Sequence, residues 1–342
     1  MTLKILTVLA GASVGGAETF FTTLTAALAR AGLDVRSVLK ANALREAALA
    51  QAGIGFEMAP FRIPLDFTTR RILRKIAEEF RPDCVLAFAG RAAAFVPRGS
   101  YALIGRLGGY YNLKNFRDCD YLVCNTPDLV RYVMEAGWPE SKVSLIPNFP
   151  SVPDAPPLER AELDTPEEAP LAVALGRLHP NKGLDVLIRA VALLPELFVW
   201  IAGDGDERGK LEELARDLHV ADRVKFLGWR SDRGALYKSA NVCVYPSREE
   251  PFGNVVVEAW SCGIPIVTTA STGPAWLVRN GEDAILTPID DPEALAGGIT
   301  TVLSSRALAA RLIAAGRQRV REEFSESAIV GRYVGLFEKA LR

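Results

Sequence analysis

The chain has 342 residues, more than the ~250–300 at which a single hydrophobic core stops growing, so two domains are expected. With 49% hydrophobic and 24% charged residues and a formal net charge of -1, its composition is that of a soluble globular protein and gives no sign of nucleic-acid binding. The longest uncharged stretch, residues 259–278, is interrupted by glycine and proline, so it is not a membrane span of ~20 apolar residues.

The distribution of charge and the placing of the cysteines further restrict the class of protein. Residues 1–150 hold 18 Lys and Arg against 13 Asp and Glu, whereas residues 151–342 hold 22 against 28, so the two halves are expected to face different partners. The five cysteines include no Cys-x-x-Cys pair and lie mostly in apolar runs, which predicts reduced, buried thiols in a cytosolic protein. With only two histidines, a histidine-cysteine metal site has too few ligands.

The first half alternates short apolar runs with helical patterns. Residues 1–12 resemble a short signal peptide, but a buried first strand fits better because Glu18, Arg30 and an amphipathic helix follow in register. The alternation predicts a parallel, doubly wound sheet. Strands are expected at 5–10, 35–39, 84–89, 103–107, 121–124 and 143–146, and helices at 17–31, 70–80 and 127–136.

Residues 150–170 interrupt this rhythm with six prolines among acidic residues, as an exposed linker does. Beyond it, strands are expected at 172–175, 198–202, 224–227, 242–245 and 266–268, helices at 183–194, 207–218 and 254–262, and a helical tail from 292 to 342. We therefore expect α/β domains at 1–150 and 171–324, a linker at 151–170 and a final helix, 325–342, that packs back on the first domain. Two such Rossmann-like domains would face each other across a ligand cleft.

The strongest motif runs from 246 to 260, after the strand at 242–245. Backbone N–H groups over Phe252, Gly253, Asn254 and Val255, at the start of a helix, form an anion site suited to a diphosphate. Glu250 and Glu258, with seven residues between them, flank this site, and carboxylates accept hydrogen bonds from sugar or ribose hydroxyls. The competing interpretation is a helix start whose acidic residues only complement the helix dipole.

A basic motif lies between the first strand and the first helix of the second domain, and it favours the interpretation of this region as a ligand-binding site. Arg177 and Lys182 are bracketed by Gly176 and Gly183 and lie where the carboxyl edge of the sheet is expected. Such a pair is usually solvated surface, but a candidate diphosphate site beside it makes ligand binding the better interpretation.

Together these segments closely resemble glycosyltransferase family 4, whose members have the two-domain GT-B fold and use nucleotide sugars. The resemblance covers nearly the whole chain and is most specific between residues 176 and 281. It rests on Gly176-Arg177-Leu178, Lys182-Gly183, Ala202-Gly203-Asp204-Gly205, Phe226-Leu227-Gly228, Tyr245-Pro246-Ser247, the spaced Glu250 and Glu258, and Cys262-Gly263-Ile264-Pro265.

The resemblance implies roles for these residues. Arg177 and Lys182 would hold the donor diphosphate, Glu250 the hydroxyls of the donor sugar, and Glu258 the ribose, while the amides of residues 252–255 complete the cradle. At the amino end, Gly15-Gly16-Ala17-Glu18 resembles the family's Gly-Gly-Ala-Glu loop, in which Gly16 lets the backbone approach the donor phosphate. The resemblance also implies that the anomeric configuration is retained. No cofactor is expected.

Two features depart from the family. Many relatives carry a histidine near the end of the strand at 83–89, where this chain has Cys-Val-Leu-Ala-Phe-Ala. The family's usual acidic residue after the loop near Gly273 is replaced around Trp276. Two Asp-x-Asp triplets occur, at 118–120 and 204–206. Such triplets hold a metal ion in glycosyltransferases of the GT-A fold. Here Arg177 and Lys182 already neutralise a diphosphate, so no metal is expected.

The expected activity is transfer of a sugar from a UDP- or GDP-sugar to an acceptor hydroxyl. A GT-B epimerase and a non-catalytic nucleotide-sugar-binding protein are the alternatives. Residues 60–117 hold 11 Lys and Arg against 4 Asp and Glu, in the domain that binds acceptors in this family. This charge favours a lipid-linked or lipopolysaccharide-type acceptor and a cytoplasmic enzyme peripheral to an anionic membrane surface, with no nucleic-acid partner.

Overall fold

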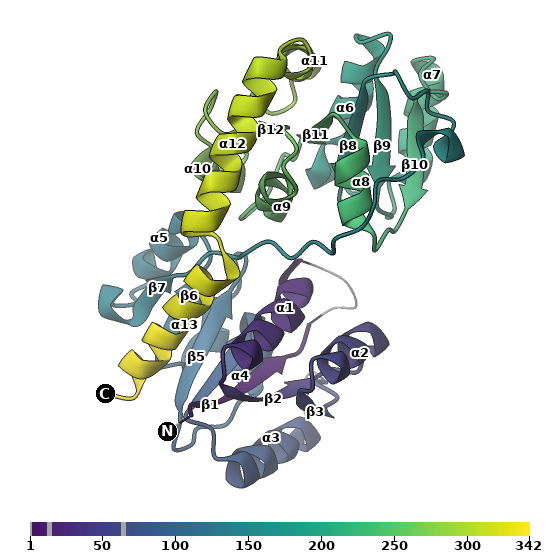
Figure 1. Ribbon diagram of the computed structural model, residues 1–342. Helices are drawn as coiled ribbons and strands as arrows, with labels where there is room; N and C mark the ends of the chain where they lie inside the picture. The colour runs from purple at the N-terminus through teal and green to yellow at the C-terminus, as the bar shows by residue number, and fades with distance from the viewer. Residues whose placement is uncertain (1, 12–15, 63–65) are drawn as a thin grey trace. The chain divides into compact units, whose positions relative to one another are not determined.

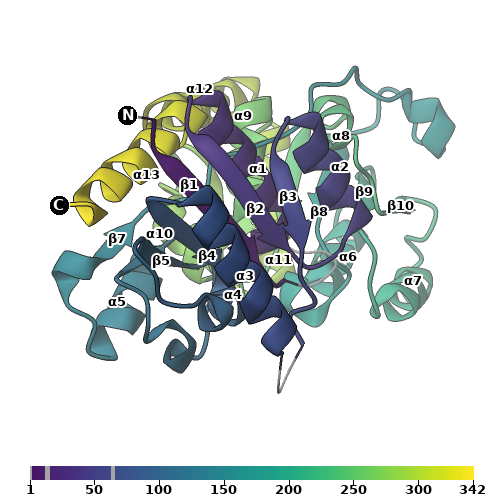
Figure 2. The ribbon, with the colours of Figure 1, turned by 90° about the horizontal axis from the view of Figure 1, so that it is seen from below.

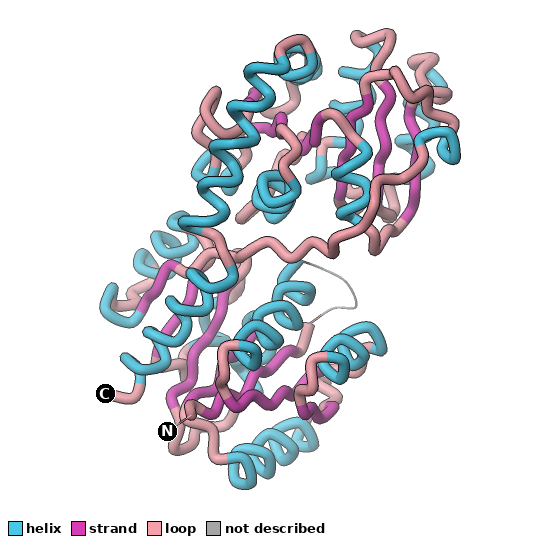
Figure 3. The backbone as a smooth tube through the Cα atoms, in the orientation of Figure 1, coloured by secondary structure: helices cyan, strands magenta, loops and turns pink. Residues whose placement is uncertain are grey.

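The computed structural model describes residues 2–11, 16–62 and 66–342. Within them the chain forms two compact units, one of residues 1–148 together with 326–342 and the other of residues 149–325. Each unit contains one parallel sheet covered by helices (Figures 1 and 3). The expected α/β class, with two Rossmann-like doubly wound domains, is therefore confirmed.

The first unit contains a parallel sheet in the order β3-β2-β1-β4-β5-β6-β7. β1 pairs with β2 on one side and β4 on the other, so the first strand is central and buried, as expected. The strands are β1 Lys4–Leu9, β2 Asp34–Leu39, β3 Gly55–Met58, β4 Cys84–Phe88, β5 Ala102–Leu107, β6 Tyr121–Cys124 and β7 Val143–Leu145. The helices are α1 Gly16–Arg30, α2 Ala43–Gln51, α3 Phe67–Phe80, α4 Ala89–Phe95, α5 Pro127–Glu135 and α13 Glu326–Ala340, with short 3-10 turns η1 Leu113–Phe116 and η2 Glu140–Lys142.

A buried arginine ties the last helix to the first unit. Arg106, at the carboxyl end of β5, is 1% exposed, and its guanidinium lies 4.4 Å from the ring centroid of Phe20 and 5.4 Å from that of Phe88. It donates to the Tyr333 hydroxyl of α13 at 3.0 Å and to the side-chain oxygen of Asn148. Hydrogen bonds and two aromatic faces thus satisfy a cation in the interior.

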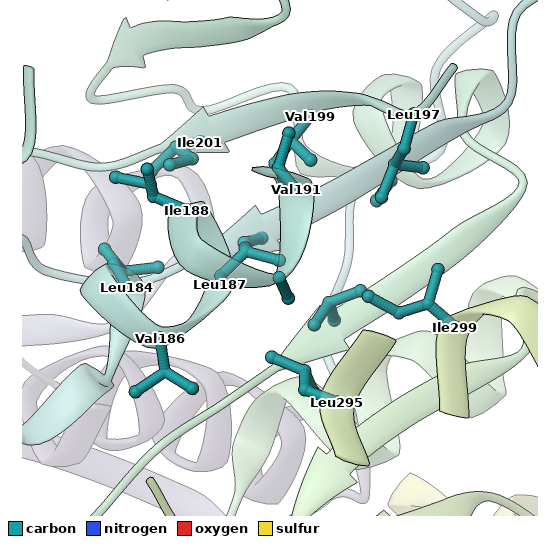
Figure 4. Close-up of a cluster of buried hydrophobic side chains, with 14 of the residues drawn as sticks. Leu184, Val186, Leu187, Ile188, Val191, Leu197, Val199, Ile201, Leu295 and Ile299 are labelled. Atoms are coloured by element: carbon teal, nitrogen blue, oxygen red, sulfur yellow. The ribbon is translucent and has the colours of Figure 1, made fainter. Parts of the chain in front are cut away.

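The second unit contains a parallel sheet in the order β10-β9-β8-β11-β12-β13. One face is covered by α6 and α11, and leucine, isoleucine and valine side chains from these helices meet those of β9 in the core cluster of Figure 4. The strands are β8 Leu171–Leu175, β9 Phe198–Ala202, β10 Val224–Gly228, β11 Val242–Tyr245, β12 Ile266–Thr269 and β13 Ile285–Thr287. The helices are α6 Leu184–Ala192, α7 Arg208–Asp217, α8 Arg233–Ser239, α9 Asn254–Cys262, α10 Thr272–Leu277, α11 Pro292–Leu303 and α12 Arg306–Glu323, with 3-10 turns η3 Arg160–Leu163 and η4 Pro180–Lys182.

The structure differs from the expected elements in several places. The tail is not helical throughout, because α11, α12 and α13 are separate and Ser305 caps α12 by accepting from the Leu308 N–H at 3.2 Å. The sequence patterns also missed α2, β3, α4, α8, α10 and β13, which are all short. The proline-rich stretch belongs to the second unit, where Arg160 donates to the carbonyl of Ser239. Four of the five cysteines are buried and none forms a disulfide.

Two glycines in neighbouring helices give a matched test of this packing. An added Cβ at Gly316 in α12 would lie 2.3 Å from Cδ1 of Trp260, whose indole is fixed by donation to the Asp283 carbonyl at 2.8 Å. We expect Gly316→Ala to lower the free energy of unfolding by about 1–3 kcal/mol through overpacking. Gly297→Ala in α11, where nothing lies within 4 Å, should raise it by up to about 1 kcal/mol. Urea unfolding measures both, and equal effects would contradict the tight α9–α12 contact.

Candidate functional site

The loops that leave the carboxyl edge of the second sheet pack tightly against one another. An added Cβ at Gly203, after β9, would lie 1.8 Å from the carbonyl oxygen of Gly176, after β8, and one at Gly183 would lie 2.1 Å from that of Pro246, after β11. Gly203 and Gly183 also have φ of +156° and +60°, which side chains rarely adopt. Glycine at 183 therefore lets the basic motif lie against the acidic motif, and glycine at 203 lets the loop after β9 lie against the basic motif.

Lys182 and Glu250 meet at this edge. Lys182 Nζ lies 2.5 Å from a carboxylate oxygen of Glu250 and 3.1 Å from the hydroxyl of Tyr245, and its ammonium also lies 5.3 Å from the Tyr245 ring centroid. The Tyr245 hydroxyl donates to the same Glu250 oxygen. Both charged side chains are mostly buried, with 20% of Lys182 and 13% of Glu250 exposed. An ammonium has three donors, so one is left after these contacts for another acceptor.

Tyr245 holds the carboxylate of this pair in place. Burial, with the adjacent Glu250 carboxylate as the next cause, raises the pKa of Tyr245 well above its ordinary value. The phenol therefore keeps its proton and stays a donor to Glu250. Tyr245 ends β11. In the sequence it was noted within the Tyr245-Pro246-Ser247 motif but given no role, although its place at the end of a buried strand could have indicated one.

Arg177 does not join this cluster. Its side chain is exposed and makes no hydrogen bond or ion pair with any residue that the structure describes. Its backbone follows Gly176, whose N–H donates to the Ala202 carbonyl at 3.1 Å, so the residue does lie at the carboxyl edge of the sheet. A solvated guanidinium at such an edge is available to an anion.

Helix α9 begins shortly after Glu250 in the chain. Gly253, with φ of 101°, precedes Asn254, the first residue of α9, and Val255 is half-buried in the first turn. The Phe252 side chain is 2% exposed and packs in the core, so this loop residue can offer a ligand only its backbone. The Gly273 N–H donates to the Glu250 carbonyl at 2.8 Å, which fixes the loop from the other side.

Glu258 lies one turn further into α9 and is buried, with 7% exposed. One carboxylate oxygen accepts from Arg233 and the other from the Tyr237 hydroxyl at 3.1 Å. Arg233 also donates to the carbonyl of Ser151 at 2.9 Å. Burial raises the pKa of Glu258, while Arg233 and Tyr237 oppose that rise. Arg233 and Tyr237 lie in α8, which the sequence patterns did not reveal.

The remaining predicted residues are dispersed. Gly15 lies outside the described residues, and Gly16, exposed, begins α1 in the first unit. Trp276, at the position of the missing acidic residue, is 38% exposed, and its ring centroid lies 6.2 Å from that of Phe252.

The two Asp-x-Asp triplets take part in local contacts. Asp118 pairs with Arg98, Asp120 accepts from the Leu103 N–H at 2.8 Å, and Asp204 accepts from the N–H of the next residue at 2.9 Å. Among the described residues, no group of three or more His, Cys, Asp or Glu could hold a metal ion, and none of the described helices is long and apolar enough to cross a membrane.

Two family models match the chain. The one described as Glycosyltransferase Family 4 matches residues 14–150, and the one described as Glycosyl transferases group 1 matches residues 157–319. A lipopolysaccharide core biosynthesis glycosyltransferase of Rhizobium meliloti (strain 1021), LpsE, is 35% identical over 336 residues, which cover 94% of this chain and 95% of LpsE. LpsD of the same strain is 35% identical over 334 residues and covers 96% of both chains.

Solved structures agree with the fold. The glycosyltransferase of Rickettsia africae ESF-5 superposes with a TM-score of 0.85 at 18% identity, covering 100% of this chain and 99% of that one. Anabaena HepE, in a crystal structure with UDP and glucose, gives 0.82 at 21% identity, covering 98% and 99%. At these identities the comparison shows the shared GT-B fold.

The buried Glu258–Arg233 pair gives a pH-dependent prediction. Arg233→Met leaves the Glu258 carboxylate buried with only Tyr237 as a partner, and we expect a loss of about 3–5 kcal/mol in the free energy of unfolding near neutral pH. Because Arg233 lowers the pKa of Glu258, its loss raises that pKa further above the unfolded value. The folded variant then binds a proton more readily than the unfolded chain, so the deficit should shrink as the pH falls toward about 5.

Urea unfolding of wild type and Arg233→Met at the two pH values measures this. The double variant Arg233→Met/Glu258→Gln removes the buried charge and should recover most of the loss at neutral pH. A deficit of equal size at both pH values, unrelieved in the double variant, would mean that Arg233 acts through packing and not through its charge.

Proposed function

We propose that this chain, which belongs to glycosyltransferase family 4, transfers a sugar from a nucleoside-diphosphate sugar, in the first place a UDP-sugar, to a hydroxyl of a lipopolysaccharide-type cell-envelope glycan. Family membership rests on both family models and on relatives that match almost end to end. The names of LpsE and LpsD support the acceptor class, and the UDP bound to HepE supports the donor.

The observation that carries the proposal is the Lys182–Glu250–Tyr245 cluster at the carboxyl edge of the second sheet. In the proposed reaction the ammonium of Lys182 and the exposed guanidinium of Arg177 neutralise charge that develops on the leaving diphosphate. The backbone over Phe252–Val255, at the start of α9, adds N–H groups of the kind that bind phosphate. Glu250, which Tyr245 fixes in place, accepts from hydroxyls of the donor sugar and orients it.

Glu258 is proposed to bind the ribose. Each of its oxygens already accepts one hydrogen bond, from Arg233 or Tyr237, and a carboxylate oxygen has room for a second. These partners fix the carboxylate before the nucleotide arrives, so little side-chain freedom is lost on binding. The donor-phosphate role expected for Gly15 and Gly16 stays a prediction from the family resemblance.

We propose retention of configuration through an ion pair, without a covalent sugar-enzyme intermediate. Glu250 is the carboxylate of the cluster. Both Lys182 and Tyr245 donate hydrogen bonds to it, which makes it a poor nucleophile. The attacking acceptor hydroxyl instead approaches on the face from which the diphosphate leaves. The proposed reaction uses no metal, since Arg177 and Lys182 supply the positive charge that a bound cation would otherwise contribute.

Substitutions in the cluster test the activity. We expect Lys182→Met and Glu250→Gln each to lower kcat by about 100-fold or more while the thermal melting curve keeps its cooperative shape, because both side chains face a loop rather than the core. UDP release and product formation are measured with purified protein, a panel of UDP- and GDP-sugars, and core oligosaccharide as acceptor. Lys210→Met is the matched control, since Lys210 is an exposed lysine of α7 paired with Glu207.

The same assay separates the alternatives. An epimerase converts the donor sugar without acceptor, and a nucleotide-sugar-binding protein binds the donor but releases no UDP. Either result with wild-type protein would overturn the transferase proposal. Unchanged rates in both cluster variants would remove the assigned roles of Lys182 and Glu250.

We also propose that the enzyme is cytoplasmic and binds the anionic face of a membrane through α3. The apolar stripe of α3, with Leu73, Ile76 and Phe80, is buried in the first unit and cannot enter a bilayer. Its other face exposes four cations, Arg70, Arg71, Arg74 and Lys75. Phe67, at the start of the helix, is 77% exposed. Basic residues near an anionic leaflet contribute ~1 kcal/mol each, and an exposed phenyl ring adds apolar contact.

Vesicle co-sedimentation tests this proposal. We expect binding to vesicles that contain anionic lipid, little binding to neutral vesicles, and loss of binding when the four α3 cations become serine. The control variant changes four arginines that are exposed outside α3 to serine, and so has the same net charge as the α3 variant. These are Arg306, Arg321, Arg332 and Arg342. Equal sedimentation of both variants would mean that overall charge, and not α3, governs attachment.

A further inference from the structure

Tyr110 is an exposed aromatic residue that its neighbours hold in one position. It follows β5 after two glycines and is 53% exposed. Its ring makes an edge-to-face contact with Tyr132 of α5, with centroids 5.3 Å apart at 80°. Its hydroxyl donates to a carboxylate oxygen of Asp128 at the start of α5. An exposed side chain held at both ring and hydroxyl has already lost most of its rotamer freedom, which lowers the entropic cost of binding a ligand there.

The supports of Tyr110 are themselves fixed. The Tyr132 hydroxyl donates to the carbonyl of Tyr111 at 2.8 Å, and Tyr111 packs inward, with its ring centroid 6.4 Å from that of Phe116. α5 in turn packs against β6 and β7 in the first unit, and Figure 2 shows α5 beside β7. The loop after β5 is therefore joined to α5 by an aromatic and a hydrogen-bonded contact.

Charged groups border the exposed ring. Asp128 accepts from Tyr110 through one oxygen and from Arg131 through the other, and the Arg131 side chain is 67% exposed. The surface thus combines a fixed aromatic face, a carboxylate and a guanidinium. A pyranose ring has matching chemistry, because its C–H groups form an apolar face that rests on the electron-rich side of an aromatic ring while its hydroxyls bond to charged groups at the edge.

We propose that Tyr110, Asp128 and Arg131 form a subsite for one pyranose ring of the acceptor glycan. The inference rests on the proposed function for the existence of a glycan acceptor, and it adds the surface that binds it. Tyr110 supplies the stacking face, and Asp128 and Arg131 bond the ring hydroxyls. The subsite lies wholly within the first unit and uses none of the residues assigned to the donor.

Binding of core oligosaccharide, released from lipopolysaccharide by mild acid, tests the subsite without requiring turnover. Saturation-transfer NMR with the full-length protein measures the dissociation constant. We expect Tyr110→Ala to weaken binding about tenfold and Tyr110→Phe, which keeps the ring, to weaken it about threefold or less. Met134→Ala, a change at an exposed apolar residue of α5 outside the subsite, should leave the oligosaccharide affinity unchanged. UDP affinity, measured by calorimetry on the same samples, should be equal in all four proteins.

Each result has a defined meaning. Equal oligosaccharide affinity in wild type and Tyr110→Ala overturns the subsite, while UDP-sugar turnover in the wild type leaves the transferase proposal standing. A wild-type protein that binds no oligosaccharide also overturns it. If Tyr110→Ala lowers vesicle co-sedimentation without changing oligosaccharide affinity, the ring contacts a membrane surface instead.

Discussion

The candidate site depends on how closely the loops of the second sheet approach one another. Where Gly203 meets the carbonyl of Gly176, and Gly183 meets that of Pro246, no side chain fits between the backbones. Glycine thus permits the close approach of the basic loop after β8 and the acidic loop after β11. Hydrogen bonds between the loops, such as that from the Arg248 N–H to the Asn181 carbonyl at 2.8 Å, hold them together. Lys182 and Glu250 are 68 residues apart in the sequence, and they meet because parallel strands end at one edge and glycine lets their loops touch.

Electrostatics then divides the site into two parts with different solvation. Lys182 and Glu250 are partly exposed and share a hydrogen-bonded tyrosine, so their pair can rearrange around a ligand. Glu258 is almost completely buried, and Arg233 with Tyr237 compensates the cost of its desolvation. In the proposed reaction this division suits the chemistry, because groups that follow moving charge need some freedom whereas a ribose contact gains from rigidity.

Sequence reasoning predicted the architecture well and the site unevenly. The buried parallel strands were predicted correctly, because an apolar run between turn residues is a strong signal for a strand. Lys182 and Glu250 were chosen because they lie in loops near glycine. Arg233 and Tyr237 were missed because α8 has seven residues, too few for helical periodicity. The break at Ser304–Ser305 was missed because apolar residues continue on both sides of it. The ligand roles of the chosen residues stay predictions.

The return of α13 to the first unit has a consequence for how the protein is made. Arg106 donates to Tyr333 of α13, and Arg30 forms an ion pair with Glu326 at 2.7 Å, so the first unit includes a segment that is translated after the whole of the second unit. During synthesis the second unit is a continuous segment and can fold as soon as it has emerged, whereas the first unit lacks α13 until later, and Arg106 then lacks the Tyr333 hydroxyl. The second unit can therefore be completed before the first, although translation of the first begins earlier, and a stop that removes α13 damages the unit whose sheet is translated first.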